Sequence, residues 1–461
     1  MTRILILFLF FFVFIINYLD QYFYFSLFSS PHFIKRTTFN NGKSFRAGII
    51  SDFQLPCFSD EKYSWQNIFI SKLNRSLRIL KAHRIDVLVI PGDIANCNTD
   101  YAYNIFNKVF NEVFNKRKPL LNIIMGNHDY YKNDPFDEDF LKKDESPEKC
   151  QKRFQKILGE KPFSHKIING YHFINWGSNN KNMKSGSNTN INWFKKRMEI
   201  AMRYNKTRPI FVITHLPPNN TVYGSLDWGN DILKEVFKPY SNIINFSGHS
   251  HFPIIDERSI WQKEFTAIQT GSTSYVELEK DRENGGIPKD ENGSWEISGK
   301  NTMGLIMDVI TDKEIKIKRI NFDYEQIIAK DWIINLNLNI TDSIYYEGKR
   351  EKISIAPEFD YINKIEYKKN NNNNKIRQII FPQAKHINFV HSYKIMFINN
   401  KEIKEYFYLS DFFLMPKDRK KYYIINVPNE IKDGEYEIKI FAIESFGKIS
   451  KNYLNNKILI N

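Results

Sequence analysis

The chain has 461 residues, more than one hydrophobic core usually organises, so we expect one large domain and at least one smaller one. Apolar residues make up 42% of it and the mean hydropathy is −0.47, which argues against a multi-pass membrane protein. The formal net charge is +14, yet lysine is spread along the whole chain and the sequence holds no arginine-rich patch, zinc-finger or RNP-like motif. We therefore expect a basic, solvated surface and no specific nucleic-acid binding.

The N-terminus has the pattern of an export signal. An unbroken apolar run, Ile4–Ile16, follows Arg3; this is the length of a signal-peptide hydrophobic region and is short for a full membrane span. A second apolar run, Tyr22–Phe28, has no good small-residue cleavage site after it, so an uncleaved anchor stays open. We predict that residues 1–28 are a signal peptide or signal anchor, and that the protein is secreted or membrane-anchored with its folded part outside the cytoplasm.

The cysteines and the glycosylation sequons also bear on whether the protein is exported. Three cysteines allow at most one internal disulfide, so the fold has to rest on its hydrophobic core, and Cys97 is expected to be an inert thiol. Six Asn-x-Ser/Thr sequons suit a secreted glycoprotein. They begin at Asn74, Asn205, Asn219, Asn245, Asn292 and Asn339.

From Phe45 to about Phe322, short apolar runs alternate with amphipathic stretches, as they do in βα units. The segments Trp65–His83 and Tyr101–Phe114 carry apolar residues at helical spacing and are predicted to be helices packed on a sheet. The runs that read as strands are Ala47–Ser51, Val87–Pro91, Leu120–Met125, His172–Trp176, Ile210–Thr214, Ile243–Ser247, Phe265–Thr270 and Gly304–Ile310.

The composition changes after Trp332, where asparagine, lysine and glutamate dominate, and the tract Asn370–Asn374 is predicted to be an exposed loop. We interpret residues 326–375 as a linker. Beyond it, the alternation of apolar and polar residues predicts antiparallel strands that form a small β-sandwich over residues 376–461, similar to fibronectin-type or immunoglobulin-like modules. The alternating segments are Ile376–Phe381, Tyr393–Asn399, Tyr422–Val427 and Tyr436–Ser445.

Five short polar motifs occur in order in the first domain, four of them directly after an apolar run. Because ligands bind at the carboxyl ends of strands in α/β sheets, polar residues at those ends converge in one crevice. A convergent set of aspartate, asparagine and histidine side chains there indicates a metal site. The motifs are Ser51-Asp52-Phe53-Gln54, Gly92-Asp93, Gly126-Asn127-His128-Asp129, Thr214-His215 and Gly248-His249-Ser250-His251.

The residue types of these motifs favour two metal ions. Aspartate offsets the charge of a dication and can bridge two of them, histidine supplies a borderline nitrogen donor, and asparagine supplies a neutral oxygen. Two ions about 3.5–4 Å apart can activate a water molecule as nucleophile and clamp phosphoryl oxygens during an in-line displacement. The pattern therefore indicates phosphoryl chemistry.

At these residues the chain resembles the calcineurin-like metallophosphoesterase superfamily, whose pattern is D-x-H, G-D, G-N-H-[DE], H and G-H-x-H. The resemblance covers residues 45–325 and implies an α/β fold, a two-sheet β-sandwich flanked by helices, with two divalent metal ions (Mn, Fe or Zn) at the strand ends. It makes Asp93 the bridging ligand and His128 the general acid, with Asp129 as its orienting partner. The remaining ligands it implies are Asp52 and His251 for one metal, and Asn127, His215 and His249 for the other.

Gln54 stands where the family pattern has the histidine of D-x-H. Its carbonyl oxygen can still ligate a metal, as a harder and weaker donor than imidazole. The leading hypothesis is hydrolysis of a phosphomonoester or phosphodiester, with a small molecule or a lipid headgroup as substrate. The alternative, motivated by Gln54, is an extracellular scaffold protein built on an inactive phosphoesterase domain. The loop after the Thr214-His215 motif is expected to line the substrate crevice, through Asn220, Tyr223, Asp227 and Trp228.

Overall fold

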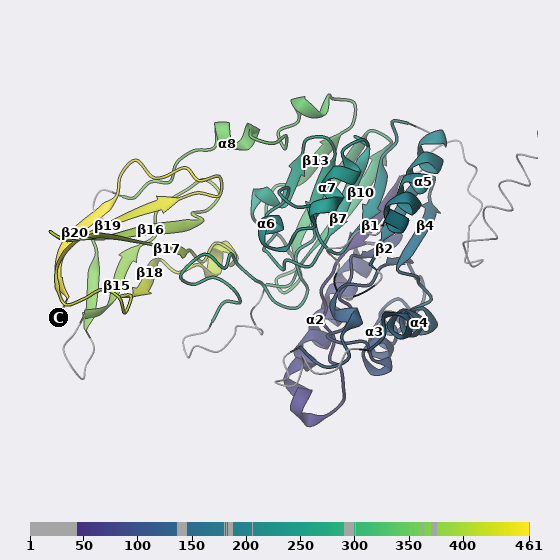
Figure 1. Cartoon of the computed structure of the whole chain (residues 1–461), viewed down its shortest axis with the longest axis horizontal. Helices are drawn as coiled ribbons and strands as arrows, with labels where there is room; N and C mark the ends of the chain where they lie inside the picture. The colour runs from purple at the N-terminus through teal and green to yellow at the C-terminus, as the bar shows by residue number, and fades with distance from the viewer. Residues whose placement is uncertain are drawn as a thin grey trace, which may run out of the picture.

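The computed structural model describes residues 44–135, 145–178, 180, 182, 188–204, 206–289, 299, 301–360, 364–369 and 376–460. The predicted signal segment and the asparagine tract lie outside these residues. In the part of the chain that is described, no helix combines the length and the apolar character needed to cross a membrane. Figure 1 shows a larger domain of sheets and helices beside a smaller all-β domain, connected by a segment that includes α8 (Lys349–Ile353).

Two β-sheets form the centre of the larger domain. The first has the strand order β12-β11-β10-β1-β2-β3, with β13 also paired to β11, and the second has the order β4-β5-β6-β7-β9-β8. Pairing is parallel from β1 to β3 and from β5 through β6 and β7 to β9. The strands are β1 (Phe45–Ile49), β2 (Val87–Ile90), β3 (Leu120–Ile123), β4 (Phe163–Ile168), β5 (Tyr171–Trp176), β6 (Ile210–Ile213), β7 (Ile243–Ser247), β8 (Ile260–Gln262), β9 (Thr266–Gln269), β10 (Met303–Thr311), β11 (Glu314–Asn321), β12 (Gln326–Ile327) and β13 (Trp332–Asn335).

Alternate residues of the central strands face two different cores, because successive side chains of a strand point to opposite sides of the sheet. In β2, Val87 and Val89 lie in the core between the two sheets, whereas Leu88 and Ile90 lie in the core beneath the helices. Phe45 of β1 contacts aromatic rings of β5 and β6 across the first of these cores. The continuous apolar runs in the sequence therefore belong to strands that are buried on both faces.

Helices cover the outer faces of both sheets, so the domain has four layers. Helices α2 (Asn67–Ala82), α3 (Asp100–Val113) and α4 (Pro147–Leu158) share a core with the first sheet, and α5 (Asn188–Tyr204) and α7 (Asp231–Phe237) share one with the second. Local sequence sets the bounds of α4: the Ser146 side chain accepts a hydrogen bond from the amide of Lys149, and Gly159 ends the helix at φ 76°. The predicted two-sheet sandwich flanked by helices is confirmed.

The smaller domain is the predicted β-sandwich. A three-stranded sheet with the order β14-β15-β18 faces a four-stranded sheet with the order β17-β16-β19-β20, and every pairing is antiparallel. Side chains of both sheets, among them Ile379, Tyr393 and Ile438, enclose a hydrophobic core. The strands are β14 (Glu366–Lys369), β15 (Ile376–Pro382), β16 (Ser392–Ile398), β17 (Ile403–Leu409), β18 (Tyr422–Asn426), β19 (Gly434–Ile443) and β20 (Leu454–Ile460).

The predicted linker, residues 326–375, is only partly a linker. Strands β12 and β13 extend the first sheet of the larger domain, and Trp332 and Ile334 of β13 point into its core while Ile333 between them is exposed. At the other end, β14 pairs with β15 and belongs to the sandwich. Strands of two to four residues are too short for their periodicity to stand out in a charged, asparagine-rich sequence, so both boundaries were misplaced.

Candidate active site

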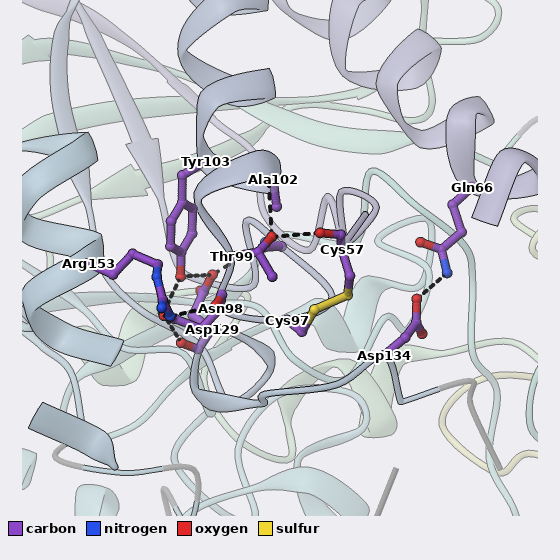
Figure 2. Close-up of a disulfide and its surroundings, with 11 residues drawn as sticks. Cys57, Gln66, Cys97, Asn98, Thr99, Ala102, Tyr103, Asp129, Asp134 and Arg153 are labelled. Carbon is purple, nitrogen blue, oxygen red and sulfur yellow. Dashed lines mark hydrogen bonds between the residues drawn. A yellow bond between two sulfur atoms is a disulfide. The ribbon is translucent and has the colours of Figure 1, made fainter. Parts of the chain in front are cut away.

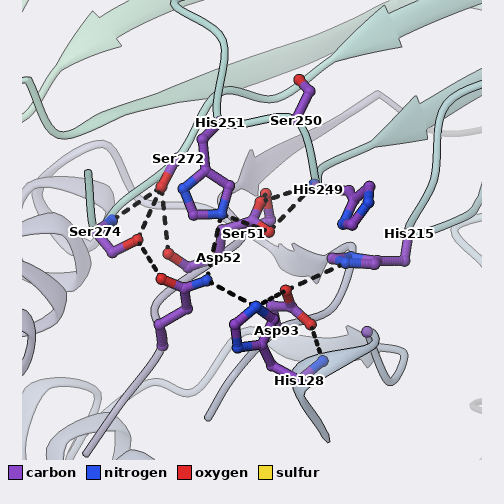
Figure 3. Close-up of polar contacts among 12 residues, drawn as sticks. Ser51, Asp52, Asp93, His128, His215, His249, Ser250, His251, Ser272 and Ser274 are labelled. Carbon is purple, nitrogen blue, oxygen red and sulfur yellow. Dashed lines mark hydrogen bonds and ion pairs between the residues drawn. The ribbon is translucent and has the colours of Figure 1, made fainter. Parts of the chain in front are cut away.

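The motif residues converge at one edge of the larger domain, as predicted (Figure 3). Asp52 and Gln54 follow β1, Asp93 follows β2, and Asn127 and His128 follow β3 of the first sheet. The second sheet supplies the other three: His215 follows β6, and His249 and His251 follow β7. The site therefore lies where the carboxyl ends of the parallel strands of both sheets meet.

Two groups of ligand atoms can each hold a metal ion. One group is Asp93, His215 and His249; the other is Asp52, Asp93 and His251; in each, the ligand atoms lie within 4.8 Å of one another. Asp93 belongs to both groups, which is the position of the predicted bridging ligand. Its Oδ1 accepts a hydrogen bond from the amide of His128 (2.9 Å), while its Oδ2 is buried and has no hydrogen-bond partner in the described part of the chain.

The two buried imidazoles are oriented by backbone carbonyls. His215 Nδ1 lies 2.8 Å from the carbonyl oxygen of Pro91, and His251 Nδ1 lies 3.2 Å from that of Tyr275. A carbonyl accepts only from a protonated nitrogen, so Nδ1 of each ring carries a proton and Nε2 is the nitrogen whose lone pair a bound metal ion would take. These lone pairs face carboxylate oxygens, 3.3 Å from Asp93 Oδ2 for His215 and 3.5 Å from Asp52 Oδ1 for His251.

The group that contains His215 and His249 has one more oxygen donor. Oδ1 of Asn127 lies 2.9 Å from His215 Nε2, and its side-chain amide donates to the hydroxyl of Tyr131 (2.9 Å), which fixes the direction of the oxygen. Lone pairs of an imidazole, an amide oxygen and a carboxylate thus face one another, an arrangement that a cation between them satisfies. The residues present therefore fit a dimetal centre.

The close packing of carboxylates and imidazoles shifts the pKa values of the site residues. Burial acts to lower the pKa of His215, but the nearby charge of Asp93 outweighs it and raises that pKa to about 9. Burial acts to raise the pKa of Asp93, yet the neighbouring imidazoles hold it well below its usual range. Carboxylate charge is thus concentrated where a dication would be held.

Backbone conformation at the site is unusual. Asp52, Gln54, Asp93, His249 and His251 all have positive φ, between 50° and 69°, although none is glycine. Such conformations cost about 1–3 kcal/mol each and persist where the surroundings enforce them, typically at functional sites. Here the enforcing contacts include backbone hydrogen bonds between the loops, for example from the amide of Asp52 to the carbonyl of Gly92 (3.2 Å).

His128 and Asp129 lie on the loop after β3, but not as the resemblance implied. The His128 ring stands at the mouth of the site with its side chain 15% exposed and Nε2 3.8 Å from Asp93 Oδ2. Burial lowers its pKa. The Asp129 carboxylate accepts from the hydroxyl of Tyr103 (3.1 Å) and from the amides of Ile94, Ala95 and Gly126, rather than from the imidazole. Asp129 therefore fixes the loop that carries His128, and its predicted contact with the ring is wrong.

Gln54 turns its amide nitrogen toward the site. Nε2 lies 3.3 Å from His128 Nε2 and 3.5 Å from His251 Nε2, and Oε1 accepts from the hydroxyl of Ser274 (3.3 Å). Ligation through the carbonyl oxygen would require the amide to rotate by half a turn, which places Oε1 where Nε2 lies. The sequence-based assignment of Gln54 as a ligand stays a prediction.

Sequence reasoning missed a supporting loop, residues 270–274, that follows β9. The Ser51 hydroxyl donates to Asp52 Oδ2 (2.5 Å) and lies 2.8 Å from the hydroxyl of Thr270, and Thr273 donates to the carbonyl of Ser51 (2.8 Å). The available signal was a run of hydroxyl residues directly after an apolar strand, the same placement that marked the ligand motifs.

A disulfide joins Cys57 to Cys97, with a Cα–Cα distance of 5.4 Å (Figure 2). It connects the loop that carries Asp52 with the loop that carries Asp93, and the Thr99 hydroxyl donates to the carbonyl of Cys57 (2.8 Å) beside it. The expectation that Cys97 is a free thiol is therefore wrong. The buried free cysteine is Cys150.

Residues 45–253 match the family model of the calcineurin-like phosphoesterases. Over this part the chain is similar to calcineurin-like phosphoesterases, and its two ligand groups fit the metal-dependent chemistry of that family. The family uses a dimetal centre, for which the two ligand groups supply the side chains. No curated protein matches the chain.

Solved structures similar to this chain include a dimetal phosphatase from Danio rerio, at 10% sequence identity and a TM-score of 0.42; the match covers 64% of this chain and 100% of that one. Another is a purple acid phosphatase from seeds of yellow lupin (Lupinus luteus), at 11% identity and a TM-score of 0.43; the match covers 66% of this chain and 56% of that one.

Proposed function

We propose that the protein hydrolyses a phosphomonoester or phosphodiester at this centre, with His128 as general acid. The observation that carries the proposal is the pair of buried ligand groups that share Asp93. Two divalent ions held there supply Lewis-acid stabilisation of phosphoryl oxygens and activation of a water nucleophile.

In this proposal the side chains of the site have two roles, metal ligand and proton donor. Asp93 would bridge the ions, Asp52 and His251, with Gln54, would hold one of them, and Asn127, His215 and His249 the other. His128 belongs to neither ligand group, and its side chain is 15% exposed with Nε2 3.8 Å from Asp93 Oδ2, which suits a proton donor to a leaving-group oxygen. Its backbone amide, by contrast, holds Asp93 in place.

We further propose that the folded part of the chain works outside the cytoplasm, secreted or tethered by its N-terminus, on a small-molecule or lipid-headgroup phosphate. Two observations support this location. The apolar run Ile4–Ile16 follows Arg3 at the N-terminus. The disulfide between Cys57 and Cys97 is a bond that reducing compartments disfavour.

The function is tested with dialysed protein, an aryl phosphate and a bis-aryl phosphate, with Mn²⁺, Zn²⁺ or Mg²⁺ added back. Turnover above a metal-only control is expected for at least one ester class. A protein that binds two ions without turning over either ester would instead support the scaffold hypothesis.

Two substitutions separate the roles of the residues. His128→Ala is expected to lower kcat by about 10²–10⁴-fold with two ions still bound, because positioned acid catalysis contributes about that much. Asp93→Asn is expected to lose both ions and activity. If His128→Ala lost its metal in proportion to its activity, His128 would be a ligand and the assignment as acid would fail.

A further inference from the structure

The C-terminal sandwich packs against the larger domain, which carries the active site and is called the catalytic domain below. The hydrophobic core between the two sheets of the larger domain also includes side chains of the smaller domain. These are Phe389, Leu409, Phe412, Phe413 and Met415. This shared core lies on the side of the catalytic domain that carries His251, because Phe252 and Ile254 are part of it.

A buried polar network crosses the boundary at His391, which directly precedes β16. Its Nε2 lies 3.1 Å from the hydroxyl of Tyr223 and 3.3 Å from Oε1 of Glu279, both in the catalytic domain. The ring centroid of Phe412 lies 4.8 Å from that of His391, so the imidazole is also held from its own side. The His391 side chain is 4% exposed.

Arg258 completes the network on the catalytic side. Its guanidinium lies 4.0 Å from the centroid of the Tyr223 ring, 3.6 Å from Glu279 and 2.8 Å from Asp256. Burial acts to raise the pKa of Glu279, but the hydrogen bond and charge of His391 and the charge of Arg258 outweigh it, so that pKa is lowered. His391 thus contacts a largely buried carboxylate whose pKa is lowered.

Tyr223 begins the first of two segments that lead from this network to the metal ligands. The segment continues through Gly224 into α6 (Ser225–Trp228), where the amide of Trp228 donates to the carbonyl of Gly224 (3.1 Å). The Trp228 ring meets the His249 ring edge-on, with a centroid distance of 5.2 Å. Trp228 thus lies beside a ligand histidine, while Tyr223 is buried; that this loop lines the substrate crevice stays a prediction.

Glu279 belongs to the second segment, residues 275–284. At its start, the carbonyl of Tyr275 accepts from His251 Nδ1, and the amide of Glu277 donates to the carbonyl of His251 (3.1 Å). Lys280 places its ammonium group 3.8 Å from the centroid of the Trp228 ring, which joins the two segments above the site.

The far end of this second segment is bonded to the sandwich. Asn284 accepts from the amide of Leu409 (2.7 Å) and donates to the carbonyl of the same residue (2.9 Å), and the amide of Glu283 donates to the carbonyl of Phe407 (2.9 Å). We call residues 223–228 and 275–284 the rim segments.

We propose that His391 is a positioning residue for the metal centre, and that the C-terminal sandwich is a working part of the active site because it holds both rim segments against His249 and His251. The inference rests on the proposed function. Partners that orient metal-ligating histidines from behind typically contribute about 10–100-fold to metal affinity or activity.

The test uses the full-length protein. Calorimetry measures Mn²⁺ affinity, thermal unfolding gives the melting temperature, and assays on an aryl phosphate give KM and kcat. His391→Phe keeps the ring against Phe412 and removes both hydrogen bonds, and it is expected to weaken binding of one of two Mn²⁺ ions by about 10–100-fold and to raise KM. His391→Gln retains a hydrogen-bonding group near Nε2 and is expected to recover most of the affinity. His386→Phe is the matched control, since this half-buried histidine of the same domain bonds only to Ile355 and nearby backbone among the described residues.

The inference would be overturned if His391→Phe kept wild-type Mn²⁺ affinity and KM, measured well below its lowered melting temperature. The network would then be a structural contact only, and the proposed function would still stand. If the wild type bound no Mn²⁺, the proposed function would fall and the inference with it. Should His391→Phe not fold, Asn284→Ala releases the second rim segment from β17 and is expected to show the same selective loss; unchanged affinity in that variant would also overturn the inference.

Discussion

Gly126→Ala tests how closely the strand ends must approach to place the bridging carboxylate. A methyl carbon on Gly126 would lie 2.5 Å from the amide nitrogen of Asp93 and 2.7 Å from its carboxylate carbon. Because non-bonded carbon atoms settle at about 3.5–4.0 Å, Asp93 would have to move by about 1 Å. Metal–ligand distances tolerate only about 0.2 Å, and a 1 Å misplacement can cost about 10²-fold in rate.

We therefore expect Gly126→Ala to lower kcat by about 10²-fold or more and to retain fewer than two metal ions after dialysis. Initial rates and elemental analysis of the dialysed protein measure both effects. The control is Gly304→Ala in β10, whose added methyl would lie 2.6 Å from Ile50 and 2.7 Å from Phe322, apolar side chains that hold no metal. It should lower the melting temperature and leave the metal content intact. Equal metal loss in both variants, or two ions and full activity in Gly126→Ala, would refute the reasoning.

Three further predictions follow from single residues. Gln54→His should tighten one metal site and shift its preference from Mn²⁺ toward Zn²⁺, because imidazole is a softer donor than an amide oxygen; identical calorimetric titrations of both proteins would show that Gln54 does not ligate. Burial, aided by Arg208, lowers the pKa of His172 from 6.5 to about 4. The contribution of neutral His172 to stability is therefore complete above about pH 6.5 and falls by about 3 kcal/mol as the pH drops to 4, since the unfolded chain then binds the extra proton. In His172→Phe, the melting temperature should depend less on pH in this range. An unchanged slope would contradict the assignment. Secreted from a eukaryotic host, the protein should carry a glycan at exposed Asn339 and none at Asn245, which is buried and donates to the carbonyl of Val212; mass spectrometry reads both positions, and a cytosolic, unglycosylated product would overturn the export proposal.

Sequence patterns predicted the features that depend on neighbours along the chain. The run Val87–Pro91 reads as a strand because all its residues are apolar, and the structure explains this by burial on both faces. The ligand motifs were recognisable for a related reason: a polar residue directly after such a run lies at a strand end, and parallel strands bring their ends together.

Pairings between distant residues could not be predicted in this way. Nothing near Cys97 identifies Cys57 as its partner, since the two approach only after β1 and β2 pair side by side. Asp129 follows His128 in the sequence, yet it bonds to Tyr103 and the backbone after β2, because a turn directs consecutive side chains to different sides.

What the sequence by itself determined is the set of chemical groups and the order of strands and helices that carries them, because periodicity and strand-end placement are local properties. Tertiary structure alone decided which groups face each other: the shared position of Asp93 in two ligand groups, the amide orientation of Gln54, and the contact of His391 with Tyr223 and Glu279. The contact between His391 and Tyr223 joins residues 168 positions apart, and such contacts form only when two hydrophobic cores bring their elements together.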